Sequence, residues 1–435
     1  MPPPPATRRA WLALGALTLA NAFAFVDRQV LSLLVEPIRH DLGLSDTQVS
    51  LLMGLGFVVV SSALAIPLGR IADTRSRRAL LAAGAAVWSA ATALTGLARS
   101  FGGVLAARLG VGAGEAALAP ASVSLLADLF PRDQLGRAMS VYSLGTFLGS
   151  GLAYVLGAWG VTVAARLPGL WPLLGRVHPW QAVYVIVGLA GMILIPLLLT
   201  LPEPRVEGQS AATPATVVPP REVSAYLRAN ARTVVPMSLG FACSAAVNYG
   251  IAAWLATFFV RTYGWPVARA GVLQGSLTMT VGVVGALAGG RLSDALVRRG
   301  RRDGPLLVGA IGAIGMIVCA GAYPLMPTAL AAAILLVPVN LFAALPWGPA
   351  SAAIADVMPA PMRGQGAGVM LLVVNLVSGA LGPTAVALAT DHLFGDPSQL
   401  RYALALVTVV GMTAATILLL AARPAYRRTV AAREA

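Results

Sequence analysis

The stretch GRIADTRSRR at residues 69–78 returns as GRLSDALVRR at residues 290–299. A second pair of stretches matches independently, because PASVSLLADLFP at residues 120–131 recurs as PASAAIADVMP at residues 349–359. Both matches preserve the order of their glycine, proline, aspartate or arginine residues. The chain is therefore predicted to consist of two related halves.

The composition indicates a membrane protein. Hydrophobic residues make up 57% of the 435 residues and charged residues 11%, whereas a soluble globular chain carries roughly a quarter charged residues. Stretches long enough to cross a bilayer lie near residues 11–34, 48–68, 79–98, 103–126, 137–160, 181–201, 233–259, 271–292, 305–325, 328–354, 365–390 and 402–422. The sequence predicts an all-α polytopic membrane protein with twelve transmembrane helices.

The repeat divides these spans into two six-helix halves related by an axis along the membrane normal, with a substrate pathway between them. We expect the N-terminal half at residues 1–201, a cytoplasmic linker at 202–230 and the C-terminal half at 231–435. The proline, glutamate, serine and threonine residues between 202 and 220 are typical of a flexible linker.

The basic residues are best explained by membrane topology. The net charge is +14, and every basic residue other than three histidines is arginine. Most arginines fall in the tails and in every second connection, so the positive-inside bias predicts that both termini are cytoplasmic, in a bacterial inner membrane. This distribution gives no support to nucleic-acid binding. Cys243 and Cys319 fall within apolar spans and are not predicted to form a disulfide or to bind a metal.

Four ionisable residues interrupt the apolar spans of the first half: Asp27, Arg28, Arg108 and Glu115. Arg108 and Glu115 are seven residues apart, so on a helix they share one face, separated by roughly 10 Å. A carboxylate in such a place can take up and release a proton. The alternative interpretation is a static buried ion pair that holds two spans together.

The second half lacks ionisable residues in its spans except near their cytoplasmic ends, so its inner wall is expected to be apolar or neutral. The predicted substrate-binding residues are Arg28, Arg108, Tyr154, Asn248, Trp254, Asn340 and Trp347. Buried asparagine and tryptophan also serve to hold helices together, which is the competing interpretation. A charged wall facing an apolar wall suits an amphipathic solute.

The repeated loop motif predicts a cytoplasmic gate. Asp73 can accept hydrogen bonds from a neighbouring helix N-terminus, and Arg77 can reach Asp128. The residues predicted for this cytoplasmic gate are Gly69, Asp73, Arg77, Asp128, Asp294 and Asp356. The alternative is that the arginines of the motif only fix the topology.

Together, the two loop motifs and the pattern R-x-x-x-G-x-G-E at residues 108–115 resemble the major facilitator superfamily along nearly the whole chain. DRQVL at 27–31, VEPI at 35–38 and LSDTQ at 44–48 are similar to bacterial members of the spinster family. This resemblance implies secondary transport by alternating access, with Asp27 next to Glu115. It also implies a lysophospholipid or sphingoid-like substrate class.

We therefore expect proton-coupled export of amphipathic lipids or related hydrophobic molecules. Asp27 and Glu115 are predicted to carry the protons, and the proton gradient, rather than a cofactor, is the driving force. The expected partners are the substrate, protons and membrane lipids, and the chain is expected to act as a monomer. The alternatives are a small organic anion symporter or multidrug exporter, and a non-transporting scaffold or receptor. No catalytic residues are predicted.

Overall fold

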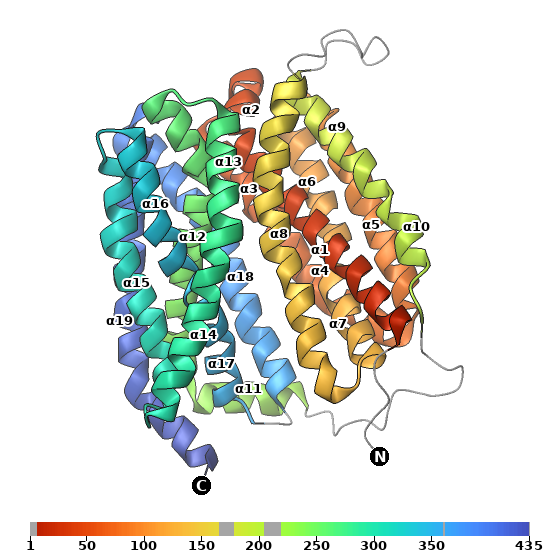
Figure 1. Ribbon diagram of the computed structural model, residues 1–435, viewed down its shortest axis with the longest axis vertical. Coiled ribbons are helices and arrows are strands. Elements are labelled where there is room, and N and C mark those ends of the chain that lie inside the picture. The colour runs from red at the N-terminus through yellow and green to blue at the C-terminus, as the bar shows by residue number, and fades with distance from the viewer. Residues whose placement is uncertain (1–6, 165–177, 204–218, 360–361, 435) are drawn as a thin grey trace. The chain divides into compact units, whose positions relative to one another are not determined.

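The computed structural model describes residues 7–164, 178–203, 219–359 and 362–434, and it divides into two compact units (Figure 1). Unit 1 comprises residues 1–211 together with 265–276, and unit 2 comprises residues 212–264 and 277–435.

Unit 1 is built from helices that carry the first six spans. They are α1 (Arg8–Leu33), α2 (Val35–Leu42), α3 (Asp46–Met53), α4 (Leu55–Thr74), α5 (Arg77–Thr95), α6 (Phe101–Glu115), α7 (Leu118–Leu129), α8 (Arg132–Ala164), α9 (Pro179–Met192) and α10 (Leu194–Leu199), joined by most of α13 (Val267–Leu277). Helix α1 packs along α8, and α5 packs against α6 and α9 (Figure 1).

Unit 2 carries the remaining spans, except that the start of the eighth, residues 267–276, belongs to unit 1. Its helices are α11 (Pro220–Ala229), α12 (Ala231–Tyr263), α14 (Val283–Arg298), α15 (Gly304–Ala322), α16 (Ala329–Ala344), α17 (Trp347–Val357), α18 (Arg363–Leu388) and α19 (Leu400–Glu434). Short π or 3-10 segments adjoin them at Thr278–Gly282, Tyr323–Leu325, Ala389–Phe394 and Pro397–Gln399. Helix α12 packs against α18 and α19, and α15 packs against α16 and α19.

The predicted all-α architecture is confirmed. Within the described ranges, twelve helical segments are long and apolar enough to cross a membrane, and they correspond to the twelve predicted stretches. Several spans consist of two helices in sequence, such as α6 and α7 or α16 and α17. A broken span is tolerated when neighbouring protein groups surround the break.

The two halves share the same helix break. Pro120 is the third residue of α7, and Pro349 is the third residue of α17. Proline has no N–H to donate to the carbonyl four residues earlier, so each helix restarts just before its proline. Asp128 and Asp356 are the penultimate residues of these two helices. The repeat read from the sequence is thus also a repeat in structure.

Glycines allow close packing of helices in both halves. A Cβ at Gly112 would lie 2.7 Å from the carbonyl oxygen of Phe57, and one at Gly289 would overlap the carbonyl oxygen of Leu345. The nearest atom to a Cβ at Gly69 would be 3.8 Å away, an ordinary contact. Close packing therefore does not require a glycine at position 69, and the gate role of Gly69 remains a prediction.

The predicted linker at residues 202–230 is partly helical. Its last third forms α11, an amphipathic helix whose Tyr226 hydroxyl donates to the carbonyl oxygen of Val357 at 2.7 Å. Residues 204–218 lie outside the described part of the chain. At its start, Glu203 contacts Arg77. Both ends of this segment are therefore anchored to helices.

Candidate functional site

An ion pair joins α1 to α6 inside unit 1. Both the Nε and the Nη2 of Arg28 donate to Oε2 of Glu115, at 2.6 and 2.5 Å. The Glu115 side chain is fully buried, whereas 31% of the Arg28 side chain is exposed. Glu115 is the last residue of α6, where the span breaks. The carboxylate of this pair is therefore buried, whereas its guanidinium remains accessible.

Aromatic rings surround the cationic partner. The Arg28 guanidinium carbon lies 4.5 Å from the ring centre of Phe57 and 4.9 Å from that of Phe25. Arg108 approaches the same Phe57 ring at 5.9 Å. Cation–π contacts of this kind stabilise a charge that has little water around it. Phe57 was not predicted, and its one signal in the sequence is an aromatic residue inside an otherwise aliphatic span.

Asp27 lies one residue before Arg28 and points to a different helix. Its Oδ2 accepts a hydrogen bond from the Thr92 hydroxyl of α5. Arg108 donates to the backbone carbonyl of Asp27 at 3.4 Å, and both of these side chains are buried. A charge at this depth is retained only with partners or with a function.

Several polar atoms of this cluster have no hydrogen-bond partner among the described residues. They are Asp27 Oδ1, Glu115 Oε1, and the Nε and Nη2 of Arg108. Most buried polar atoms in native proteins are paired, and exceptions concentrate at functional positions. The cluster therefore keeps both acceptor and donor capacity for protons or for a ligand.

The structure brings the four predicted intramembrane charges together, with a different pairing from the expected one. Arg108 and Glu115 were expected to act as one stripe, and Glu115 instead pairs with Arg28. Arg108 is completely buried against α1, so it is less accessible than Arg28. Arg28, rather than Arg108, is thus the cation that a solute could reach.

A second charge cluster joins α5, α7 and the end of the sixth span. Arg77 donates to Asp128 at 2.6 Å and to Glu203 at 3.0 Å. Its Nη1 also donates to the carbonyl and hydroxyl oxygens of Ser124. Arg77 is buried, whereas half of the Asp128 side chain is exposed. The contact between Arg77 and Asp128 is the one that the gate prediction requires.

Glu203 was not predicted, because it lies in the segment read as linker. Partial burial acts to raise its pKa, but hydrogen bonds from the Arg78 N–H, the Arg77 side chain and the Ser76 hydroxyl outweigh this and lower the pKa overall. Glu203 therefore stays ionised and holds Arg77. The side chain of Asp73, at the end of α4, lies outside the described part of the structure.

In unit 2 the corresponding aspartates have different partners. Asp356 accepts a hydrogen bond from the Tyr426 hydroxyl at 2.9 Å, and Arg433 donates to its backbone carbonyl. Asp294 is exposed, and no ion pair joins it to the arginines that follow it in the described part of unit 2. The Arg77 contact thus has no counterpart at these two aspartates in the described part of unit 2, and their gate role remains a prediction.

Asp303 forms two ion pairs within unit 2. It accepts hydrogen bonds from Arg423 at 2.5 Å and Arg427 at 2.7 Å. Burial acts to raise the pKa of Asp303, but these two arginines lower it overall. Asp303 precedes α15 and both arginines belong to α19, so the three residues fasten these helices together.

The candidates for the neutral wall are mainly used in helix packing. Trp254 is fully buried and donates to the Pro383 carbonyl at 2.9 Å, so including it among substrate contacts was wrong. Asn340 donates to Leu336 in its own helix at 2.9 Å. Tyr154 is buried, beside Gly275 of α13. These three side chains therefore agree with the competing interpretation, in which they hold helices together.

Two other wall candidates keep some capacity for a ligand. Asn248 donates to the Ala343 carbonyl at 3.3 Å, and its Oδ1 is buried without a partner in the described structure. The side chain of Trp347 is half exposed at the start of α17. The predicted binding role remains a prediction for both.

Comparison with known families accounts for the architecture and the repeat. The model of the Major Facilitator Superfamily matches residues 17–383. The chain belongs to this superfamily. It is 28% identical over 431 residues to an MFS-type efflux pump of Mycolicibacterium smegmatis, covering 97% of this chain and 95% of that protein.

The spinster resemblance is supported by both sequence and structure. The chain is 26% identical to protein spinster of Drosophila melanogaster over 72% of its own length and 50% of that protein, so it spans about half of that relative. A solved bacterial homologue of the human lysosomal transporter spinster, inward-facing and unoccupied, matches with a TM-score of 0.83, 26% identity and 98% coverage of both chains. The protein is thus a spinster-like, multi-pass membrane transporter of this superfamily, whose members move small molecules.

Proposed function

We propose that this transporter moves amphipathic lipids, or related hydrophobic molecules, across the membrane by proton-coupled alternating access. The observation that carries the proposal is the ion pair between the buried Glu115 and the partly exposed Arg28. The Glu115 carboxylate and an anionic headgroup can compete for Arg28, and a proton that neutralises Glu115 favours the headgroup.

The coupling follows from the geometry of the pair. Protonation of Glu115 Oε2 removes the charge that holds Arg28, and the guanidinium becomes available for phosphate or carboxylate oxygens. Loss of that proton restores the ion pair and displaces the headgroup. Arg28 is suited to the exchange because its planar fork binds oxyanions in two-point fashion.

Asp27 is proposed as the second proton carrier. Its Oδ2 is held by Thr92, while its Oδ1 has no hydrogen-bond partner among the described residues. It is adjacent in sequence to Arg28, so its charge influences the same cation. We expect Asp27 and Glu115 to titrate as a coupled set, and Asp27→Asn to impair proton-driven transport.

The surroundings of Arg28 support an amphipathic solute. Phe25 and Phe57 present aromatic surface beside the guanidinium. A headgroup on Arg28 would therefore have apolar groups next to it, where a chain can lie. A sugar would need more neutral hydrogen-bonding groups than this cluster offers.

The Arg77 cluster is proposed to act as the cytoplasmic gate. It ties α5 to α7 and to Glu203 with buried, charge-assisted hydrogen bonds. Because Asp128 is half exposed, its bond can break at modest cost when the helices move. We also propose a bacterial inner-membrane location, cytoplasmic termini and a monomeric state.

A small organic anion is the second candidate substrate. The chain is 26% identical over 347 residues to a probable L-galactonate transporter of Escherichia coli, covering 76% of this chain and 72% of that protein. Arg28 would bind a sugar-acid carboxylate as readily as a lipid phosphate. The aromatic residues around it favour the amphipathic solute.

Transport by purified protein in proteoliposomes tests the proposal. We expect an imposed pH gradient to drive movement of a labelled anionic lysophospholipid, and an excess of unlabelled lysophospholipid to compete. Competition by L-galactonate instead would favour the organic anion candidate. Absence of transport of either solute, with or without the gradient, would contradict both and favour a scaffold or receptor.

A further inference from the structure

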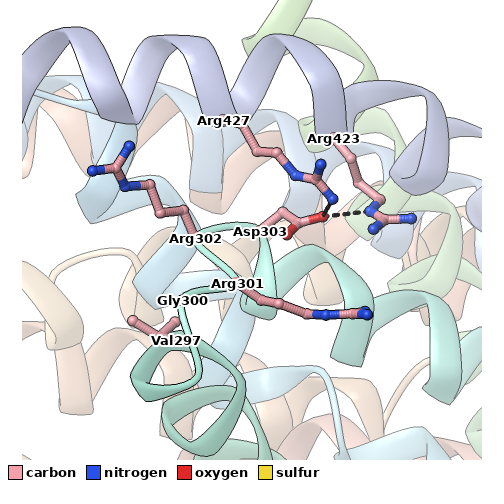
Figure 2. Close-up of a pocket in the computed structure, with 7 residues that line it drawn as sticks. All are labelled: Val297, Gly300, Arg301, Arg302, Asp303, Arg423 and Arg427. Atoms are coloured by element: carbon pink, nitrogen blue, oxygen red, sulfur yellow. Dashed lines mark hydrogen bonds and ion pairs between the residues drawn. The ribbon is translucent and has the colours of Figure 1, made fainter.

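A pocket rich in arginine belongs to unit 2, whereas the ion pair of α1 and α6 belongs to unit 1. Its volume is about 740 Å³. It is lined by Val297, Gly300, Arg301, Arg302, Asp303, Arg423 and Arg427 (Figure 2). Four arginines and one aspartate therefore line a single pocket, and the proposed transport mechanism uses none of them.

The backbone around the pocket is fixed by the local sequence. Gly300 has a φ of +81°, which favours glycine, and its N–H donates to the Val297 carbonyl at 2.9 Å. The N–H of Arg301 donates to the Leu296 carbonyl at 3.0 Å. These two bonds form a Schellman motif that ends α14. The connection that carries Arg301 and Arg302 thus has a defined shape.

The single carboxylate of the pocket is already neutralised. Figure 2 shows the guanidinium groups of Arg423 and Arg427 directed at Asp303. Each uses one nitrogen for this bond, through Nε in Arg423 and Nη2 in Arg427. An arginine has five N–H donors, so both retain donors for a second oxyanion. The pocket as a whole therefore has a positive excess that favours a multiply charged anion.

The pocket also lies at the boundary of the membrane-spanning segments. One span ends at Arg298 and the next begins at Gly304, so the residues between them form a short connection at the membrane surface. On α19, Ile417 and Leu420 are 62% and 38% exposed. Leu420 and Arg427 are seven residues apart and share one face of the helix. An exposed aliphatic stripe therefore leads to the arginines.

We propose that this pocket binds the phosphate headgroup of an anionic phospholipid, whose acyl chain lies along the exposed stripe of α19. Arginine pockets between helices at a membrane surface suit such headgroups, and arginine forms charge-assisted bonds with phosphate oxygens. A free phosphate would use the arginines alone. The aliphatic stripe that adjoins them favours the lipid.

Native mass spectrometry of the detergent-purified protein with added phosphatidylglycerol tests this proposal. The test variant is Arg301→Gln with Arg302→Gln, which leaves the Asp303 ion pairs intact. The matched control is Arg298→Gln with Arg299→Gln, which removes the same charge from exposed arginines that do not line the pocket. Losing one charge-assisted hydrogen bond lowers binding about tenfold, so the test variant should retain at least about tenfold less phosphatidylglycerol than the control.

Three results would overturn the proposal. They are equal losses in the test and control variants, wild-type retention of phosphatidylcholine equal to that of phosphatidylglycerol, and displacement of the lipid by millimolar inorganic phosphate. The last would show that the pocket takes the phosphate group without the chain. Thermal unfolding midpoints of both variants check that they fold, and the single variant Arg301→Gln should show a smaller loss in the same direction.

Discussion

Glu115→Gln changes only the charge of the buried partner of Arg28, and its effect can be worked out from the ion pair. A hydrogen bond to a charged group contributes about 1.5–3 kcal/mol, and a neutral one about 0.5–1.5 kcal/mol. Since 31% of the Arg28 side chain is exposed, solvent screening places the difference near the low end. We take about 1 kcal/mol, which is a factor of about five.

Arg28 should therefore leave the neutral amide of the Glu115→Gln variant about five times more readily than it leaves the ionised glutamate of the wild type. At a pH where Glu115 is ionised, the variant should bind an anionic lysophospholipid about fivefold more tightly than the wild type. Wild-type affinity should rise as the pH is lowered, because protonation releases Arg28. The variant should lack this pH dependence and should not couple transport to a proton gradient.

Binding is measured by titration calorimetry in detergent at several pH values, and coupling by uptake into proteoliposomes. The matched control is Glu222→Gln, the same isosteric change at an exposed residue of α11. It should leave both the affinity and its pH dependence at wild-type values. Retention of wild-type pH dependence or of proton-driven uptake by the Glu115→Gln protein would refute the competition mechanism.

Three further predictions concern the packing and ion pairs of the two units. Arg77→Gln should lower the free energy of unfolding by about 2–3 kcal/mol, because it removes the charge-assisted hydrogen bonds from a buried guanidinium to the half-exposed Asp128 and to Glu203. Arg78→Gln on the exposed side should cost less than about 0.5 kcal/mol. Thermal unfolding in detergent compares the two variants, and equal losses would contradict the assignment. Folding lowers the pKa of Asp303, so the ionised carboxylate stabilises the protein at pH values above its unfolded pKa of about 3.9, and this stabilisation is lost as the pH falls further. The stability advantage of the wild type over Asp303→Asn should therefore shrink on acidification. A difference that stays constant with pH would refute this prediction. Gly112→Ala should destabilise unit 1 by about 1–3 kcal/mol, because the new methyl group would press on the Phe57 carbonyl. An unchanged thermal unfolding midpoint would show that α4 and α6 can move apart freely.

The fold was predictable because its signals are local. Apolar length alone gives the spans, and the positions of Pro120 and Pro349 give the matching breaks. Close-packed glycines were harder to assign. Gly69 and Gly112 look equivalent in the sequence, but only Gly112 faces a backbone carbonyl of a neighbouring helix. That difference depends on how two helices are rotated about their axes.

The sequence was sufficient to identify the residues of the site, but not which of them form ion pairs with one another. A charge inside an apolar span stands out in any sequence, so Asp27, Arg28, Arg108 and Glu115 could all be found. The seven-residue spacing linked Arg108 to Glu115, yet Glu115 bonds across the helix interface to Arg28. Glu203 was missed because it pairs with a residue 126 positions away and follows no helical period.

The break between α6 and α7 has a consequence for how the fourth span unfolds locally. Pro120 has no N–H, so the backbone carbonyl of Ala116 receives no helical hydrogen bond from it. The two helices therefore meet at a point where the ladder of amide bonds is interrupted. In hydrogen–deuterium exchange, α6 and α7 should then open separately, each helix with its own free energy of opening. Glu115 belongs to α6 and Asp128 to α7, so ligand binding at Arg28 can protect the amides of α6 without protecting those of α7.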